Sequence, residues 1–392
     1  MTERLEDALR AQLDALTAQG LYHRTNVLES PQAARVRMDG REIMMLSSNN
    51  YLGLADHPKI IEAAKAALDT YGNGPASVRY ICGTLDLHKR LEARIAAFLG
   101  MEAAVVYVSA SAANMGLIPA LMGEEDAIFT DGLNHASIID GIRLSKARRH
   151  IYSHGDVGAL EKDLLEDPDA RLKMVVTDGV FSMEGDLAKL PEITALAAKH
   201  DAFVVVDDSH ATGVVGATGR GTPERFGVKV DIITGTLGKA LGGSCGGFVA
   251  GSAALIDFLS QKSRPYIFSN ALPPAVAAGA LAAIDLVEKE PGLRERLADN
   301  TRYFRAGMAS LGFHVLAGEH PITPVIVGET ATAHKMSAAL FEEGVFVSGF
   351  GYPVVPKGEA RLRAQVSAAH TRADLDFALS AFKKVGKQAG II

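Results

Sequence analysis

A series of short apolar runs, separated by segments of helical character, constrains the fold of this chain more than any other feature. The runs are rich in valine and isoleucine and lie at residues 104–108, 127–130, 174–177, 203–206, 232–236 and 247–250. Runs of this length that do not alternate with polar residues are typical of strands buried on both faces of a mainly parallel sheet. The sequence therefore predicts an α/β fold with a large, doubly wound, mainly parallel sheet.

The two ends of the chain have a different texture from this central part. Near the start, Leu5, Leu9, Leu13 and Leu16 lie at helical spacing before Gly20, which predicts a helix that ends there. After about residue 291 the pattern changes to helix and short mixed strands, as in an α+β domain. We therefore predict an N-terminal helix and arm at 1–55, a large domain at 56–290 and a smaller C-terminal domain at 291–392.

The charge, the cysteine count and the apolar content of the chain argue against several classes of protein. Lysine and arginine number 40 against 46 aspartate and glutamate, a formal net charge of −6, and the basic residues are scattered, so nucleic-acid binding has no electrostatic support. Cys82 and Cys245 are the two cysteines, too few for a disulfide framework or a cysteine-rich zinc site. The most apolar long stretch, around 272–287, contains two prolines and an aspartate, so it is too short and too interrupted to span a bilayer. A cytoplasmic protein without metal or membrane anchor is expected.

Polar side chains gather where four of the predicted strands end. In open α/β sheets, ligands bind at the carboxyl ends of the strands, so these segments are the first candidates for a site. They carry small hydroxyl residues, two histidines, carboxylates and a lysine, at residues 109–114, 131–135, 207–210 and 235–239. Together they offer an anion site, an aromatic base, a carboxylate and an amine.

The lysine among them, Lys239, lies in a glycine-rich turn after a predicted strand. Taken alone it is more simply explained as a surface lysine. Combined with Asp207, it provides the two groups that pyridoxal phosphate requires, an amine for its carbonyl carbon and an acid for its pyridine nitrogen. Asp208 could take the place of Asp207, and we favour Asp207 because His210 lies three residues beyond it.

Three other predictions compete with plain structural explanations. His210 would lie near the phenolic oxygen of the cofactor, or bond to backbone within the core. His135 would stack on a flat ring, or simply pack. Ser109, Ala110 and Ser111 open a predicted helix and would bind phosphate through backbone N–H groups, whereas the commoner role for Ser109 is an N-cap.

A hydrolase is the main alternative from a different class. Residues 242–246 match the G-x-S-x-G pattern of a nucleophile elbow, with Ser244 as the nucleophile. That motif joins a strand to a following helix, whereas here it precedes an apparent strand. The segment 235–239 also fails the nucleotide P-loop pattern, since Ile233 and Ala240 stand where that motif has glycine and a hydroxyl residue.

Five segments in order resemble the α-oxoamine synthases, fold-type I pyridoxal-phosphate enzymes that condense an amino acid with an acyl-CoA. They are residues 48–54, 134–141, 178–183, 207–210 and 235–239, and the resemblance extends from about residue 5 to residue 379. It implies a homodimer with a shared active site. Segments 76–84 and 262–270 are most similar to the branch that joins glycine to acetyl-CoA. The branch that joins alanine to pimeloyl-CoA, a dual-specificity enzyme and a non-catalytic pyridoxal-binding regulator are alternatives.

The resemblance also implies roles for individual residues. Lys239 would hold the cofactor and remove the α-proton of the substrate, Asp207 would pair with the pyridine nitrogen, and His135 would stack on the ring. Ser182 and His210 would contact the phenolic oxygen of the cofactor. The phosphate would be held by Thr236, Ser109, Ala110 and Ser111, with Ser269 of a second subunit. Arg363 and Asn49 would bind the substrate carboxylate. Ser111 departs from the aromatic residue usual at its position.

Overall fold

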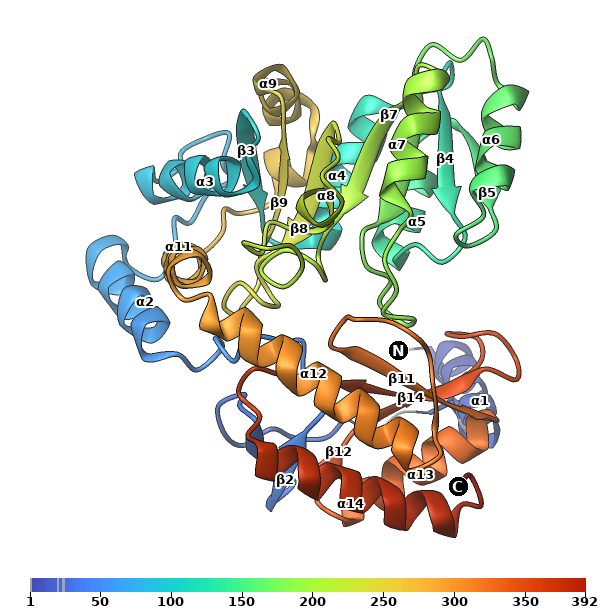
Figure 1. Cartoon of the computed structure of the whole chain (residues 1–392). Coiled ribbons are helices and arrows are strands. Elements are labelled where there is room, and N and C mark those ends of the chain that lie inside the picture. The colour runs from blue at the N-terminus through green and yellow to red at the C-terminus, as the bar shows by residue number, and fades with distance from the viewer. Residues whose placement is uncertain (1, 20, 23–24) are drawn as a thin grey trace.

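A seven-stranded sheet forms the centre of the larger part of the molecule in this computed structural model, which describes residues 2–19, 21–22 and 25–392 (Figure 1). Its strands lie in the order β3 (Ala103–Tyr107), β9 (Gly247–Gly251), β8 (Ile232–Thr236), β7 (Phe203–Asp207), β6 (Lys173–Asp178), β4 (Ala127–Asp131) and β5 (Arg148–Tyr152). The strands from β8 to β5 pair in parallel, and β9 is antiparallel to both of its neighbours. The predicted mainly parallel sheet is confirmed.

Helices cover both faces of this sheet, which explains why its central strands are apolar throughout. Val176 of β6 packs with α4 (Ala110–Leu121) and α5 (Ala136–Leu144), whereas its neighbour Val175 packs with α6 (Val157–Glu166) and α7 (Leu190–Lys199). Successive residues of a strand point to opposite faces, so a strand covered on both sides has no polar face.

Strand β5 is the one member of the sheet that the apolar runs do not indicate. It reads Arg148-Arg149-His150-Ile151-Tyr152 and is largely exposed at the sheet edge. Charged side chains are common on edge strands because they oppose pairing with another chain. The charged composition that protects this edge strand is therefore also the reason why apolar runs do not predict it.

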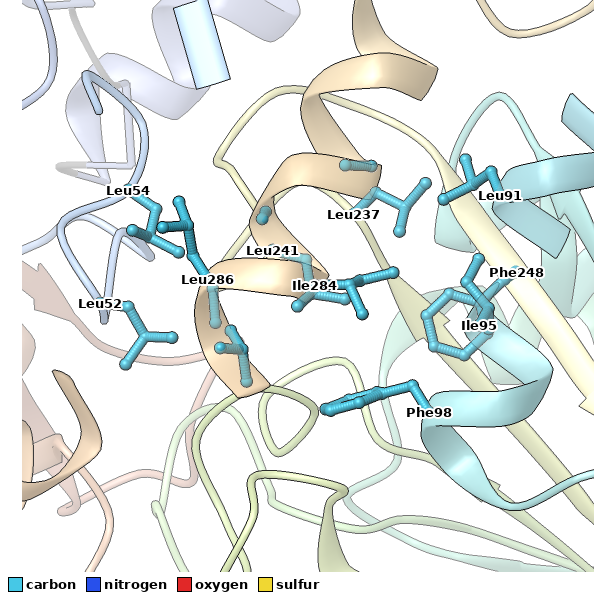
Figure 2. Packing of buried hydrophobic residues seen from close by; sticks show 14 of the residues in the cluster. Leu52, Leu54, Leu91, Ile95, Phe98, Leu237, Leu241, Phe248, Ile284 and Leu286 are labelled. Atoms are coloured by element: carbon cyan, nitrogen blue, oxygen red, sulfur yellow. The ribbon is translucent and has the colours of Figure 1, made fainter. Parts of the chain in front are cut away.

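A second group of helices closes the other end of the sheet, next to β3, β9 and β8. It comprises α2 (Pro58–Tyr71), α3 (Asp86–Leu99) and α11 (Pro274–Lys289). Figure 2 shows Leu91, Ile95 and Phe98 of α3 facing Phe248 of β9 and Ile284 of α11 across one buried cluster. Leu237 and Leu241 enter the same cluster from the loop after β8. Core packing thus holds the segment that carries Lys239 on both sides.

The smaller part of the molecule contains two short sheets and the helices that pack against them (Figure 1). One sheet has the order β10 (His314–Val315), β11 (Ile322–Gly328), β14 (Ala360–Gln365) and β13 (Ser348–Phe350), and the other joins β1 (Arg35–Met38), β2 (Arg41–Met45) and β12 (Val345–Phe346). Helices α12 (Gly292–Ser310), α13 (Thr330–Glu342) and α14 (Arg372–Gln388) pack against them. Because β2 pairs with β12, the end of the N-terminal arm predicted at 1–55 packs with the predicted C-terminal domain at 291–392. We retain boundaries near 55 and 290 as a proposal.

The remaining helices lie at the periphery. The leucine pattern near the start forms α1 (Glu3–Ala18), which buries none of its residues, and Gly20 lies outside the described residues. The others are α8 (Thr222–Phe226), α9 (Ala253–Lys262) and α10 (Arg264–Phe268). Within the part of the chain that the structure describes, no helix is both long enough and apolar enough to cross a bilayer.

Candidate active site

The carboxyl ends of β7 and β8 and the N-termini of α4 and α5 meet around one pocket, with about 710 Å³ of empty space including its open mouth. Parallel strands present their carboxyl ends at the same sheet edge, so segments far apart in sequence converge there. Eight of the predicted site residues line this pocket: Ser109, Ala110, Ser111, His135, Asp207, His210, Thr236 and Lys239. The fold therefore brings together the amine, the carboxylate, the histidines and the anion site predicted from the strand ends.

Lys239 projects into this pocket from the loop after β8. Its Nζ lies 2.8 Å from Nε2 of His210, and burial lowers its pKa to about 8. A lysine with a pKa in this range keeps a usable fraction of neutral amine near neutral pH, the form that attacks a carbonyl carbon or accepts a proton. The surface-lysine alternative does not fit a side chain in this environment.

His210 connects Lys239 to the interior of the protein. Its Nδ1 lies 2.8 Å from the hydroxyl of Tyr51, and its backbone carbonyl lies 3.0 Å from Nε2 of His320. Burial, with the nearby charge of Lys239, lowers the pKa of His210 well below its usual value. The ring is therefore neutral at physiological pH, with one nitrogen on the pocket side.

The two adjacent aspartates face different surroundings. Asp207 lines the pocket, where its carboxylate accepts hydrogen bonds from Nδ2 of Asn114 at 2.7 Å and from the backbone N–H of Ser209 at 2.9 Å. Asp208 instead accepts from the N–H and the hydroxyl of Thr222, away from the pocket. Of the two residues that the sequence left open, Asp207 is the one that can reach a ligand there.

His135 precedes α5 and caps it, because its Nδ1 accepts the backbone N–H of Ser137 at 3.2 Å. Its own backbone N–H donates to the carboxylate of Asp178 at 3.0 Å. Burial and the neighbouring charge of Asp207 raise the pKa of Asp178 well above its usual value. The side chain of His135 is thus held at the pocket wall, where it can cover a flat ligand.

The anion site lies where α4 begins. Ser109 is an N-cap, since its hydroxyl accepts the N–H of Ala112 at 3.0 Å, and it lines the pocket as well. A Cβ on Gly247 would meet the backbone N of Ala110 at 2.4 Å, so glycine there lets β9 press against the start of the helix. Thr236 also lines the pocket, and its hydroxyl accepts from the N–H of Gly238 at 3.0 Å. Backbone N–H groups at a helix start favour phosphate.

Arg363 lies beside the pocket on β14, and its surroundings are unusual for a cation. Its Nη1 donates to the carbonyl of Ser182 at 3.0 Å, and its guanidinium lies 4.8 Å from the ring centroid of Phe350. Among the described residues no carboxylate forms an ion pair with it, since the nearby Glu184 pairs with Arg361 instead, and its Nε–H is buried without a hydrogen-bond partner. A half-buried guanidinium without an anion favours a carboxylate ligand.

Gln365 joins this guanidinium to the rest of the site. Its side chain accepts from Arg363 at 3.2 Å and donates to Oδ1 of Asn49 at 2.7 Å and to the hydroxyl of Tyr51 at 3.0 Å. Since Tyr51 bonds to His210 and His210 to Lys239, one chain of contacts links Arg363 to the amine. Arg363 and Asn49, predicted as a pair, are held together by a residue that the sequence did not indicate.

Several residues of the site were missed or lie apart from it. Asn114, Tyr51, Gln365 and Asp178 were not predicted, although Gln365 follows Arg363 by two and shares its face of β14. The pocket lining does not include Ser182 or Ser269 of this chain. The roles predicted for these two serines, in particular supply of Ser269 by a second subunit, stay predictions.

The loop that supports Arg363 is held by a second charged cluster. His154 lies 3.0 Å from Asp131 and 3.1 Å from Asp186, and these hydrogen bonds raise its pKa to about 10. A raised pKa means that the folded protein gains stability from protonated His154, fully below pH about 6.5 and progressively less as the pH rises through about 10. We expect His154→Gln to lower the free energy of unfolding at pH 6 by about 2 kcal/mol and by far less near pH 10. Denaturant titrations at both pH values check this, and a loss equal at both would contradict it.

The hydrolase alternative fails on topology. Ser244 lies in the loop between β8 and β9, and β9 returns antiparallel to β8. A nucleophile elbow requires a strand followed directly by a helix, which places the serine at the sharp turn between them. The G-x-S-x-G match is therefore coincidental.

Comparison with known proteins agrees with this geometry. The family profile of aminotransferase class I and II matches residues 41–382. Curated relatives include the 2-amino-3-ketobutyrate coenzyme A ligase of Escherichia coli strain K12, 50% identical with 97% of each chain covered, and the 8-amino-7-oxononanoate synthase of Symbiobacterium thermophilum, also 50% identical, covering 99% of this chain and 100% of the relative.

Solved structures give the same result. The serine palmitoyltransferase of Sphingomonas wittichii matches with a TM-score of 0.94 and 34% identity, and a structure of SPT with PLP internal aldimine matches with 0.94 and 33%, each covering 98% of both chains. At such identity over nearly the whole length, the likeness shows family and fold together. This chain therefore belongs to the class I and II aminotransferase family, and within it to the α-oxoamine synthases, acyltransferases of fold type I that depend on pyridoxal phosphate.

Proposed function

We propose that this enzyme condenses glycine with acetyl-CoA to give 2-amino-3-oxobutanoate and free CoA. The observation that carries the proposal is the arrangement of Lys239, Asp207 and Arg363, an amine and a carboxylate in one pocket beside a guanidinium that has no counter-ion within the described part of the chain. The choice of substrates is supported by segments 76–84 and 262–270 and by the relatives named 2-amino-3-ketobutyrate coenzyme A ligase.

The residues present fit pyridoxal phosphate. The pocket offers a buried amine, a hydrogen-bonded carboxylate and a helix start, one for each of its aldehyde, pyridine nitrogen and phosphate. We propose that Lys239 holds the aldehyde carbon and Asp207 keeps the pyridine nitrogen protonated. His135 would cover the ring, His210 and Ser182 would contact its phenolic oxygen, and the phosphate would be held by Thr236, Ser109, Ala110 and Ser111.

When bound, the cofactor would delocalise the electron pair that remains on the substrate carbon after its proton is removed. In this proposal the amine of Lys239 takes that proton from Cα of the amino acid, a task suited to a pKa of about 8. Arg363 and Asn49 bind the substrate carboxylate and hold the Cα–H bond toward Lys239. Orientation of this kind can lower a barrier by several kcal/mol. The carbon then attacks the acyl thioester, and CoA leaves.

The resemblance also bears on assembly, and the cysteines bear on location. We propose a homodimer in which Ser269 of the second subunit completes the phosphate site, so that the monomer is inactive. Cys82 and Cys245 are exposed and unpaired, as in proteins of a reducing compartment, which supports a cytoplasmic location. Ser111, where relatives usually have an aromatic residue, would alter packing beside the ring and with it the acyl-chain preference.

The second candidate is 8-amino-7-oxononanoate synthesis from alanine and pimeloyl-CoA, because relatives of that name are equally similar. We expect thiol release with glycine and acetyl-CoA to exceed that of every other pair in a panel of glycine, alanine and serine against acetyl-, pimeloyl- and palmitoyl-CoA, by at least about tenfold. Faster release with alanine and pimeloyl-CoA, accompanied by CO₂, would establish the second candidate. Absorbance of the bound cofactor without any thiol release would indicate a non-catalytic binder.

A further inference from the structure

We propose that Gln365 is a positioning residue that sets the amide orientation of Asn49 and the direction of the Arg363 guanidinium, so that both present N–H groups to the carboxylate of the amino acid. This inference rests on the proposed function, since it assigns Gln365 to the same carboxylate site. It begins with strand geometry. Arg363 and Gln365 lie on the same face of β14, while Leu362, Ala364 and Val366 point into the core.

The orientation of the Gln365 amide is determined by its partners. A guanidinium can only donate hydrogen bonds, so the Gln365 atom facing Nη2 of Arg363 at 3.2 Å must be the oxygen Oε1. The amide nitrogen then faces the opposite way, where it meets Oδ1 of Asn49 at 2.7 Å and the hydroxyl of Tyr51 at 3.0 Å. Gln365 is 1% exposed, so water cannot replace any of these partners.

The orientation of Gln365 in turn determines that of Asn49. Because Nε2 of Gln365 donates both of its hydrogens, the Asn49 atom in front of it must be an acceptor, which is Oδ1. The Nδ2 group of Asn49 therefore turns away from Gln365, and since it donates to none of the described residues, both of its hydrogens stay available to a ligand. The two terminal nitrogens of Arg363 donate to Ser182 and Gln365, and its buried Nε–H has no hydrogen-bond partner among the described residues, so this N–H also stays available to a ligand.

Tyr51 makes the arrangement rigid. Its hydroxyl is fully buried, accepts from Gln365 and lies 2.8 Å from Nδ1 of His210. Burial raises the pKa of Tyr51, so the phenol keeps its proton and remains a neutral partner in this network. A side-chain amide with all of its donors and its oxygen engaged has one orientation only. Gln365 thus acts on the substrate through Asn49 and Arg363 without contacting it.

The test replaces the amide by a carboxylate of the same shape. In Gln365→Glu the new carboxylate would pair with Arg363 and accept from Asn49, which must then rotate and turn its oxygen toward the ligand. Two probes separate binding of the carboxylate from binding of the amine: glycine, and methylamine, which has no carboxylate. With protein loaded with pyridoxal phosphate, we expect absorbance titrations to show glycine binding weakened by at least about tenfold in the variant. Methylamine binding should stay within about twofold of that of the unaltered protein.

Gln365→Met is the companion variant, because it removes the amide without adding charge. We expect it to weaken glycine binding less than Gln365→Glu does and to leave methylamine binding unchanged. It also carries the test if the glutamate variant fails to fold, as checked by its melting temperature. Unchanged glycine binding in a folded variant would overturn the inference, and so would equal losses for both probes. If the unaltered protein itself failed to bind glycine or pyridoxal phosphate, the proposed function would fail instead.

Discussion

Replacing Lys239 with alanine is expected to lower thiol release from acetyl-CoA by at least about a thousandfold, because it removes both the group that holds the cofactor and the base that takes the Cα proton. Its amine lies 2.8 Å from His210 in the pocket, with a pKa lowered to about 8. Thiol release and the absorbance of protein dialysed after loading with pyridoxal phosphate are the two measurements. The unaltered protein should keep its colour, and the variant should lose the cofactor on dialysis.

Lys229→Ala is the matched control for this substitution. Lys229 is exposed and precedes β8, the same strand whose far end carries Lys239. We expect this variant to retain both its colour and its activity within about twofold, because surface substitutions rarely affect a distant site. If Lys239→Ala kept more than about a tenth of the activity, the amine at position 239 would not be the reacting group.

The second large effect concerns the adjacent aspartates. Asp207→Asn is expected to reduce activity by about a hundredfold or more, since a neutral amide cannot keep a pyridine nitrogen protonated as a carboxylate can. Asn114 and Ser209 hold this carboxylate in place, so its geometry does not depend on the cofactor. Steady-state rates at saturating glycine and acetyl-CoA, after loading with excess pyridoxal phosphate, separate the chemical effect from weak cofactor binding.

Asp208→Asn serves as the comparison. Asp208 is fully buried against Thr222, and burial raises its pKa to about 7, so its carboxyl group is partly neutral near physiological pH. An amide of the same shape should lower the melting temperature, because one of the two Thr222 donors loses its acceptor, but leave turnover within about threefold. Equal losses of activity in the two variants would mean that these aspartates act through stability, and the assignment of Asp207 to the ring nitrogen would fall.

Local sequence patterns predicted most of the large domain and most of the pocket. Valine and isoleucine runs marked the central strands because a strand covered by helices on both faces cannot alternate with polar residues. Because the carboxyl ends of parallel strands meet at one sheet edge, the sequence alone predicts that Lys239, Asp207, His210 and Ser109 lie together, as they do in the pocket. Strand β5 was not predicted by apolar runs, because edge strands commonly carry charged side chains.

Only the tertiary structure decided how the substrate side of the site is built. Asn49 and Gln365 lie more than 300 residues apart in the chain, and their contact depends on how the arm and β14 pack together, which no local pattern encodes. The choice between Asp207 and Asp208 also depends on tertiary structure. Adjacent residues at a strand end point in different directions, and only the surrounding chain shows which of the two faces the pocket. The sequence alone determined which chemical groups gather at the sheet edge, because strand direction follows from short-range patterns. The hydrogen-bond partners that orient those groups depend on long-range packing, and therefore on the folded chain.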